Sequence, residues 1–434
     1  MTNTKQTLSD LVSCLSDYDP DALPVAQAQQ IIGGFIAPVN AIEKLAIRAA
    51  LGRVLAADVV SPIDVPAHDN SAMDGYALRG SDLVAATGNN TALTLRVIGT
   101  AYAGRAFDAA VGSGECVRIM TGGVMPDGCD TVVPQECTQG ASNDSVTLPA
   151  GVVRAGDNRR LKGEDLAAGR SALRQGKILR PADLGLLASL GVAEVPVRRR
   201  LRVAFFSTGD ELRSIGEVLD PGCVYDSNRY TLYGMLTRLG CDLIDMGVIK
   251  DEPAALEAAF RSACENADAV ITSGGVSVGA ADYTKQIMAQ LGDVTFWKIG
   301  MRPGRPMAFG RIGCGAKSAA LFGLPGNPVA VMVTFYFLVR DALLQMMGAS
   351  PAPLPLLRAS AQSAIRKKPG RTEYQRGILS TDASGQQQVR ITGSQGSGIL
   401  RSMSEANCMV VLQHEQGNVA AGEAVDVLPF EGLL

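Results

Sequence analysis

The sequence predicts a multi-domain α/β plus β protein, and three patterns support this fold class. Between residues 201 and 350, apolar runs typical of buried strands alternate with helical segments, which predicts a central α/β domain with a mostly parallel sheet. Residues 67–154 carry short apolar runs broken by "PDG" and "SGE" turns, which predicts a β-rich domain. Residues 351–434 contain three apolar runs separated by Gly-containing turns, so we expect a small C-terminal β domain there.

The central domain, residues 201–350, is predicted in most detail. Its strands are expected at residues 201–206, 241–249, 267–272, 294–300, 307–312 and 319–323. Its helices are expected at residues 229–239, 253–266, 286–291 and 327–347. Alternation of this kind is typical of parallel strands joined by helical crossovers.

The two remaining segments, residues 1–66 and 155–200, are predicted to form one discontinuous, helical linker domain, with the β-rich domain inserted between them. Residues 39–51 are expected to form a helix, because Asn40 and Glu43 are spaced like a capping pair and Gly52 follows the end. A second helix is expected at residues 181–190, which also precede a glycine.

The composition is that of a globular protein without a marked charge. Of 434 residues 47% are hydrophobic, which is enough for several buried cores, and the net charge is only -3. This balance gives no general attraction to nucleic acid or to an anionic membrane, so neither is expected as a partner. The first ten residues are polar, and the longest apolar stretch, residues 329–339, is too short to span a bilayer. We therefore expect a cytoplasmic protein.

Cysteine and histidine usage restricts the chemistry further. The nine cysteines form no CxxC pair, which argues against a disulfide framework and against a thiolate zinc site. His68 and His414 are the only histidines, so neither a Ser-His-Asp triad nor a His-rich metal centre is expected. The chemistry must therefore rest on carboxylates, hydroxyls, amides and cations.

Polar residues follow nearly every predicted strand of the central domain. In an open α/β sheet, ligands bind beyond the carboxyl ends of the strands. Each of these polar residues, taken singly, is common in turns and needs no functional explanation, but together they predict a binding cleft. The residues are Thr208, Asp210, Glu211, Lys250, Asp251, Ser273, Ser277, Asp282, Lys298, Arg302 and Arg305, with Pro325, Gly326 and Asn327 before the last helix.

The mixture of charges in this cleft indicates the kind of ligand. The stretch "TSGGVSVGAADYTK", which includes Gly274 and Gly275, offers backbone amides to a phosphate. The carboxylates Glu211, Asp251 and Asp282 would repel a phosphate unless a hard cation such as magnesium lies between them. The alternative to a metal site is that these carboxylates only form a solvent-exposed acidic rim. In "RPGRP", two arginines set between prolines suit a second oxyanion, and surface ion pairs are the alternative there.

Two stretches outside the central domain carry more polar groups than turns need. "HDNSAMDGYAL", residues 68–78, contains Asp74, and "RIMTGGVMPDGCDTVVPQE" contains Thr121 before a Gly-Gly pair. Asx-turns and helix caps account for two or three of these groups. The rest have no structural explanation in the sequence.

A series of motifs together resembles a known enzyme family. "DNSAMDGYA", "MTGG" with "VVPQE", "GEDL", "STGDEL", "YDSNR", "TSGGVSVGAADYTK", "RPGRP" and "GLPGNPVA" look like the successive motifs of molybdopterin molybdenumtransferases of the MoeA type, also represented in the C-terminal part of gephyrin. The resemblance runs from about residue 25 to the end. It implies an elongated homodimer of four-domain subunits. It also implies an enzyme that inserts molybdate into adenylylated molybdopterin, releases AMP and requires a divalent cation, magnesium or zinc.

The resemblance implies roles for individual residues as well. The catalytic residues would be Asp74, Thr121, Glu211, Asp251 and Asp282; the first two would come from the β-rich domain of the partner subunit, and the last three would hold the metal. The substrate would contact Ser273, Gly274, Gly275, Ser277, Lys298, Pro325, Gly326 and Asn327. Molybdate would contact Arg302, Arg305, Arg376 in "YQRG" and Ser397 in "SQGSG". Family members often have lysine where Arg302 and Arg305 stand, which keeps the charge but changes the contacts.

The sequence leaves two other functions open. The central domain alone resembles the molybdopterin adenylyltransferase domain, so an adenylyltransferase using ATP is one alternative, and a non-catalytic scaffold of the gephyrin kind is the other. The extra domains and the Asp74 segment argue against the first. Neither a fused adenylyltransferase domain nor a long linker is seen in the sequence, which argues against the second. A separate adenylyltransferase is a candidate docking partner.

Overall fold

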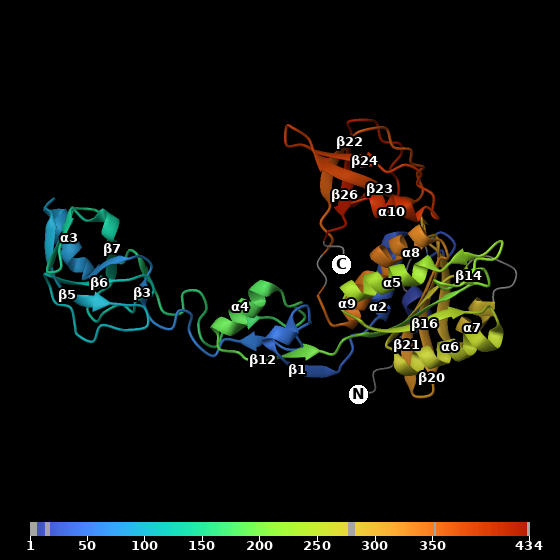
Figure 1. The fold of residues 1–434 in the computed structure, drawn as a ribbon, viewed down its shortest axis with the longest axis horizontal. Helices are drawn as coiled ribbons and strands as arrows, with labels where there is room; N and C mark the ends of the chain where they lie inside the picture. Colours follow the sequence, from blue (N-terminus) through green and yellow to red (C-terminus); the bar gives the residue numbers. More distant parts are fainter. Residues whose placement is uncertain (1–6, 14–17, 277–282, 351–352, 432–434) are drawn as a thin grey trace.

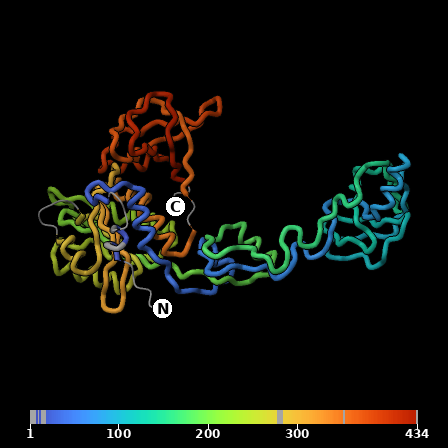
Figure 2. Tube along the Cα trace, turned by 180° about the vertical axis from the view of Figure 1, so that it is seen from behind, coloured from blue at the N-terminus to red at the C-terminus, as the bar shows by residue number. Residues whose placement is uncertain are grey.

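The computed structural model describes residues 7–13, 18–276, 283–350 and 353–431. The protein is elongated, with the β-rich domain at one end, a narrow linker in the middle, and the α/β and C-terminal domains together at the other end (Figure 1). Figure 2 shows the chain passing twice through the linker, once toward the β-rich domain and once on the way back. The predicted multi-domain α/β plus β architecture is confirmed.

A six-stranded sheet forms the centre of the α/β domain. Its strands are β13 (Arg202–Thr208), β16 (Asp242–Ile249), β17 (Ala269–Ser273), β18 (Gly292–Lys298), β20 (Pro306–Cys314) and β21 (Lys317–Leu324). The order is β16-β13-β17-β21-β20-β18, and the first four strands run parallel. Because β20 is antiparallel to both of its neighbours, β18 runs in the direction of the parallel strands. The carboxyl ends of all strands except β20 therefore meet at one edge.

Helices cover both faces of this sheet. They are α5 (Ser227–Arg238), α6 (Pro253–Asn266), α7 (Tyr283–Leu291), and one long helix made of α8 (Pro328–Thr334), the π segment η3 (Phe335–Val339) and α9 (Arg340–Met346). α6 and α7 pack over one core, and α5 and the long helix pack over another. By length and composition the long helix resembles a membrane span, but 72% of its apolar window is buried inside the protein. Its apolar residues therefore form part of the core of this domain.

The N-terminal helices α1 (Leu8–Ser13) and α2 (Val25–Phe35) also pack on the central domain. The ring of Phe35 lies 5.4 Å from that of Phe309 on β20. The prediction that all of residues 1–66 belong to the linker is therefore wrong. α2 has an apolar face that is buried in the central core, and the linker begins only after this helix.

The linker consists of short antiparallel strand pairs and one helix. β1 (Ile42–Ala46) pairs with β12 (Glu194–Arg198), and β2 (Val59–Val60) pairs with β11 (Ser171–Leu173). The helix α4 (Pro181–Ser189), which was predicted from the sequence, packs on them over a small core of its own. This domain is thus less helical than expected.

The predicted helix at residues 39–51 is wrong. These residues form the strand β1 and the 3-10 turn η1 (Ile47–Ala50). Glu43, expected to cap a helix, instead accepts a hydrogen bond from Arg53 at 2.6 Å. Pairing with the distant strand β12, which places Leu45 opposite the buried Val195, outweighs the local capping signal.

The β-rich domain is a six-stranded sheet with one helix, α3 (Gly80–Gly88). The strands are β4 (Gly75–Leu78), β5 (Leu93–Ala101), β6 (Glu115–Ile119), β7 (Thr131–Pro134), β8 (Gly140–Ala141) and β9 (Ser145–Leu148). Short elements at its edges are β3 (Asn70–Ser71), which pairs with β10 (Arg159–Arg160), and the 3-10 turn η2 (Gln135–Cys137).

The C-terminal domain is a small barrel. Its strands are β22 (Leu357–Ala361), β23 (Thr372–Thr381), β24 (Gln387–Ile391), β25 (Cys408–Leu412) and β26 (Ala424–Pro429), with the helix α10 (Leu400–Glu405). The sheet closes because β23 pairs with β25 as well as with β24. A short strand of the central domain, β19 (Met301–Arg302), also pairs with β23 and places Arg302 opposite Glu373. This pairing joins the two domains next to the predicted cleft.

Candidate active site

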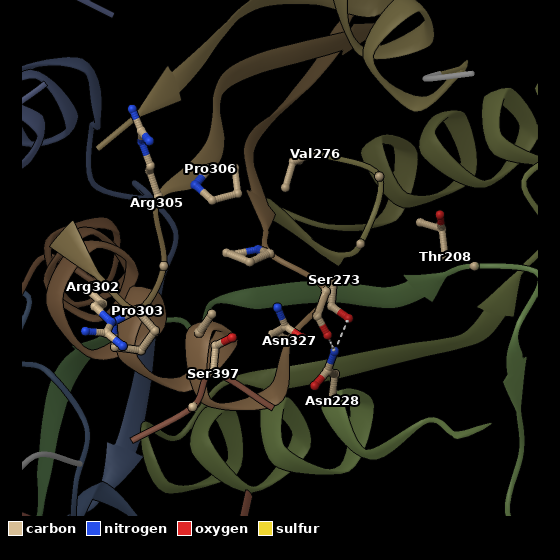
Figure 3. Close-up of a pocket in the computed structure, with 18 of the residues that line it drawn as sticks. Thr208, Asn228, Ser273, Val276, Arg302, Pro303, Arg305, Pro306, Asn327 and Ser397 are labelled. Carbon is tan, nitrogen blue, oxygen red and sulfur yellow. Dashed lines mark hydrogen bonds between the residues drawn. The ribbon is translucent and has the colours of Figure 1, made fainter. Parts of the chain in front are cut away.

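A cavity of about 710 Å³ lies at the carboxyl edge of the central sheet, where the C-terminal domain meets it (Figure 3). Its size is typical of small-molecule sites. The residues that line it are Thr208, Gly209, Glu211, Leu212, Asn228, Asp251, Ser273–Val276, Met301–Pro306, Pro325–Asn327, Ala330, Arg371 and Gln395–Ser397.

Most residues of the predicted cleft come together in this cavity. They are Thr208, Glu211, Asp251, Ser273, Gly274, Gly275, Arg302, Arg305, Pro325, Gly326, Asn327 and Ser397, whereas Asp210 and Lys250 do not line it. Ser277 and Asp282 lie outside the described residues, so their roles stay predictions. Lys298, Arg376, Asp74 and Thr121 lie elsewhere in the described chain, as set out below.

The loop after β17 lines the cavity with backbone. Gly274 and Gly275 have φ values of 95° and 67°, a region that favours glycine. A Cβ atom on Gly274 would lie 2.4 Å from the carbonyl oxygen of Thr208, and one on Gly275 would lie 2.6 Å from the hydroxyl of Thr284. Close packing therefore requires both glycines, and the cavity meets main chain rather than side chains at these two positions.

Buried hydrogen bonds connect the elements behind this loop. Ser273 accepts a bond from Nδ2 of Asn228 at 3.0 Å, drawn in Figure 3, and its hydroxyl lies 3.3 Å from that of Ser207 on β13. The same Asn228 nitrogen donates to the carbonyl of Gly326 at 2.7 Å. Ser207 in turn donates at 2.9 Å to Asp226, whose carboxylate caps α5. The loops after β17 and β21 are thus held together from the start of α5.

Two carboxylates, Glu211 and Asp251, line the cavity at the ends of β13 and β16. The hydroxyl of Thr208 donates a short hydrogen bond to Asp251 and orients it. Two carboxylates beside a Gly-rich loop fit magnesium, which commonly binds one or two carboxylates, waters and substrate phosphates. Within the described ranges, no three His, Cys, Asp or Glu side chains cluster into a metal site.

A cationic corner, formed by Arg302, Arg305 and Arg371, occupies another part of the wall. In Figure 3, Arg302 and Arg305 lie on the side away from Thr208. Arg302 Nη1 is 3.7 Å from Glu373 Oε2, and Arg371 Nη2 is 2.7 Å from the other oxygen, Oε1. Glu373 is only 1% exposed, so a buried carboxylate holds two of the three arginines.

Lys298 lies at the end of β18, next to the cationic corner. Its Nζ forms an ion pair with Oδ1 of Asp21 at 2.6 Å. The hydrogen bond from Lys298 holds the pKa of the Asp21 carboxyl below its usual value. The structure thus gives Lys298 a partner in the N-terminal segment, and its predicted contact with substrate stays a prediction.

Arg376 is buried behind the cavity wall, with 1% of its surface exposed. Its guanidinium donates to the Ser402 hydroxyl at 3.0 Å and to the carbonyls of residues 394–396 at 2.9 to 3.4 Å. Burial, together with the nearby charge of Arg302, lowers the pKa of Arg376 to about 10. Arg376 thus holds the loop that carries Ser397 to the cavity, and its predicted contact with molybdate stays a prediction.

Asp74 and Thr121 lie together in the β-rich domain, which the linker separates from the cavity of the same chain (Figure 1). Oδ1 of Asp74 accepts hydrogen bonds from the Thr121 amide at 2.6 Å and from its hydroxyl at 2.7 Å. These bonds hold the pKa of the Asp74 carboxyl below its usual value. A role in the cleft would require that the pair come from a second subunit.

Comparison with known proteins establishes the family. Models of the MoeA N-terminal region (domain I and II), of a probable molybdopterin binding domain, and of the MoeA C-terminal region (domain IV) match residues 23–191, 204–345 and 358–430. The chain belongs to the MoeA family. The resemblance seen in the sequence motifs is confirmed.

Relatives in the MoeA family match nearly the whole chain. The molybdopterin molybdenumtransferase of Haemophilus influenzae is 44% identical over 393 residues, 90% of this chain and 95% of the relative. That of a Nostoc species is 37% identical over 382 residues, 88% of this chain and 87% of the relative. The crystal structure of the molybdopterin biosynthesis moeA protein from Pyrococcus horikoshii OT3 is 28% identical and covers 94% of this chain and 100% of its own, with a TM-score of 0.80.

Asn228 and Arg371 are among the cavity residues of this MoeA family member that were not predicted from the sequence. Asn228 belongs to the motif "YDSNR", for which no residue role was predicted. Its side-chain amide is buried at the start of α5, beside the strand ends, and this position is what indicates a role in the cavity. Arg371 carries no local signal beyond its charge. Only the pairing of β19 with β23 brings it to the cavity.

Proposed function

We propose that this protein, a molybdopterin molybdenumtransferase of molybdenum cofactor biosynthesis, inserts molybdate into adenylylated molybdopterin and releases AMP. One observation carries the proposal: a single cavity combines a Gly-rich loop, two carboxylates and a cluster of arginines. Backbone amides suit phosphate groups, carboxylates suit a divalent cation, and arginines suit a second oxyanion.

The two sides of the cavity would bind the two substrates. Ser273, the glycines after it and the "GLPGNP" loop would hold the phosphate and pterin side of adenylylated molybdopterin. The Asn228 amide donates hydrogen bonds to both loops and so fixes their positions relative to each other. Arg302, Arg305 and Ser397 would hold molybdate at the other side, so that the two ligands meet within one cavity.

Glu211 and Asp251, with Asp282, would hold magnesium; zinc is the alternative. When bound, the cation would neutralise charge that develops as the pyrophosphate is cleaved. The Thr208 hydroxyl keeps Asp251 turned toward this position. Asp251 and Glu211 come from the ends of adjacent strands and so converge on one place.

A homodimer completes the proposed site. The Asp74–Thr121 pair is prearranged by two hydrogen bonds, yet the linker holds it away from the cavity of its own chain. An antiparallel arrangement of two elongated subunits would bring the pair of one subunit to the cavity of the other. The active site would then be shared between subunits.

The protein is proposed to be cytoplasmic, and a molybdopterin adenylyltransferase is proposed to dock on it. All eight cysteines within the described ranges are free thiols, as is usual in a reducing compartment. Direct transfer from an adenylyltransferase would protect its product, the substrate of this cavity, from release into solution.

The deciding experiment is AMP release from adenylylated molybdopterin, measured with and without molybdate in the presence of magnesium. Molybdate-dependent release is the expected result. ATP consumption without molybdate would identify an adenylyltransferase instead. Partner binding without any AMP release, unaffected by the Asp251→Asn substitution, would favour a scaffold.

A further inference from the structure

Arg371 is a third arginine at the cavity wall, and its position is fixed more firmly than that of Arg302 or Arg305. Its Nε donates to Oε1 of Glu373 at 2.8 Å, and its Nη2 lies 2.7 Å from the same oxygen. The side chain is 35% exposed and lines the cavity. Arg371 is thus anchored by one edge of its guanidinium while part of its surface stays accessible.

Glu373 is the anchor for this arrangement. Its side chain is 2% exposed, and its second oxygen, Oε2, accepts a bond from Gln375 Nε2 at 3.1 Å and lies 3.7 Å from Arg302 Nη1. The pairing of β19 with β23 sets Arg302 opposite Glu373, so the contact depends on the junction between the two domains. One buried carboxylate therefore sets the spacing between two guanidinium groups from different domains.

The charges at this corner do not cancel. Arg302, Arg305 and Arg371 line the cavity, and Glu373 is the carboxylate that contacts two of them. Lys298 is paired with Asp21 and adds little net charge. Arg302, Arg305 and Arg371 against Glu373 leave about two positive charges at the corner itself, and Arg376, buried close to Arg302 behind the wall, adds a further positive charge, so the corner favours a dianion over a monoanion.

We propose that Arg371 binds the oxyanion directly, that Glu373 is a positioning residue for Arg371 and Arg302, and that the corner selects tetrahedral dianions over monoanions. The identity of the dianion as molybdate rests on the proposed function. The selection by charge does not, because it follows from the three arginines and their shared anchor.

The test is calorimetric titration of the full-length protein with molybdate and with perrhenate, a tetrahedral monoanion, in the absence of any pterin. Removing one cation should cost a dianion twice the Coulomb energy that it costs a monoanion. For Arg371→Ala we expect molybdate to bind at least about tenfold more weakly and perrhenate only about threefold more weakly. Equal weakening of both anions would contradict charge selection.

Arg401→Ala is the matched control. It removes the same charge from the same domain, but Arg401 is 87% exposed and paired with Glu405 at 2.6 Å on α10. We expect unchanged binding of both anions. If Arg371→Ala behaved like Arg401→Ala, direct contact would be refuted.

Glu373→Gln separates positioning from charge. This substitution makes the corner more positive, so a purely electrostatic role predicts tighter molybdate binding, whereas a positioning role predicts weaker binding because the arginines lose their anchor. We expect binding at least about fivefold weaker. Tighter or unchanged binding would refute the positioning role. Arg371→Lys, which keeps the charge and loses the two-point anchor, should also weaken molybdate binding and covers the case in which Glu373→Gln does not fold.

These titrations also separate this inference from the proposed function. If the anions bind as expected but molybdate does not stimulate AMP release, the proposed function fails and the dianion site stands. If AMP release depends on molybdate but Arg371→Ala binds it normally, the function stands and the role of Arg371 is refuted.

Discussion

The side-chain amide of Asn228 donates a hydrogen bond to the hydroxyl of Ser273 at 3.0 Å, and the same nitrogen reaches the Gly326 carbonyl at 2.7 Å. Asn228 is 6% exposed and lines the cavity. One amide therefore connects two loops that would both contact the pterin ligand.

Asn228→Asp should weaken binding of adenylylated molybdopterin about tenfold or more, because the carboxylate keeps the shape but sets an oxygen against the Gly326 carbonyl. The cost of one unsatisfied buried acceptor is about 1–3 kcal/mol. Calorimetric titration of the ligand measures it. Thr231→Ala, which removes a hydrogen bond elsewhere on α5, serves as the control. Wild-type affinity in Asn228→Asp would show that the link between the loops is unimportant.

Asp251→Asn should leave the fold intact and slow AMP release roughly a hundredfold, a loss of about 3 kcal/mol of charge stabilisation. The Thr208 hydroxyl still finds an acceptor in the amide oxygen, so the loop should stay in place. Single-turnover assays across a magnesium titration provide the measurement. The control is Asp242→Asn, at the start of the strand β16 that precedes Asp251, and it should leave the rate of AMP release unchanged. Near-normal turnover of Asp251→Asn would remove this residue from the metal site.

Asp74→Ala and Asp251→Ala should each be inactive alone and regain activity when mixed. In hybrid dimers, one of the two shared clefts would have both an intact Asp74 and an intact Asp251. The measurement is AMP release after subunit exchange, with each variant mixed with itself as the control. Absence of recovery, despite exchange proven by mass spectrometry of tagged subunits, would argue that the cleft is not shared.

Arg376→Ala should destabilise the C-terminal domain by about 3 kcal/mol or more, because it leaves several buried acceptors without donors. The molybdate requirement should rise as well, since the loop that carries Ser397 loses its support. Thermal unfolding followed by a molybdate titration measures both effects. Arg390→Ala, on the exposed face of β24, is the control. A raised molybdate requirement with unchanged stability would instead indicate direct contact with the anion.

Much of the cleft could be predicted because the direction of the strands determines which polar loops lie next to one another. Once β13, β16, β17 and β21 are parallel, their carboxyl ends share an edge, and Glu211, Asp251 and Ser273 must lie near one another. No knowledge of side-chain packing is needed for that step. The same reasoning does not predict how deeply each side chain is buried.

Arg376 and Arg371 show where the prediction ended. Arg371 directly precedes β23 and Arg376 lies within it, and the motif "YQRG" drew attention to Arg376 alone. The strand β23 alternates between a face toward the barrel and a face toward the domain junction, and its pairing with β19 decides which arginine meets the cavity. Arg376 is buried against residues 394–396, and Arg371 remains at the wall.

By itself, the sequence determined the strands and helices of the central domain, the edge at which the ligand loops meet, and the family, because these depend on local periodicity and on motifs contiguous in the chain. The tertiary structure decided that residues 42–46 form a strand, that α2 belongs to the central core, and which arginine reaches the cavity. Each of these depends on a partner distant in the sequence: β12 for the strand, the ring of Phe309 for α2, and the strand β19 for Arg371. The energy of such contacts is absent from any local window, so no local pattern predicts them.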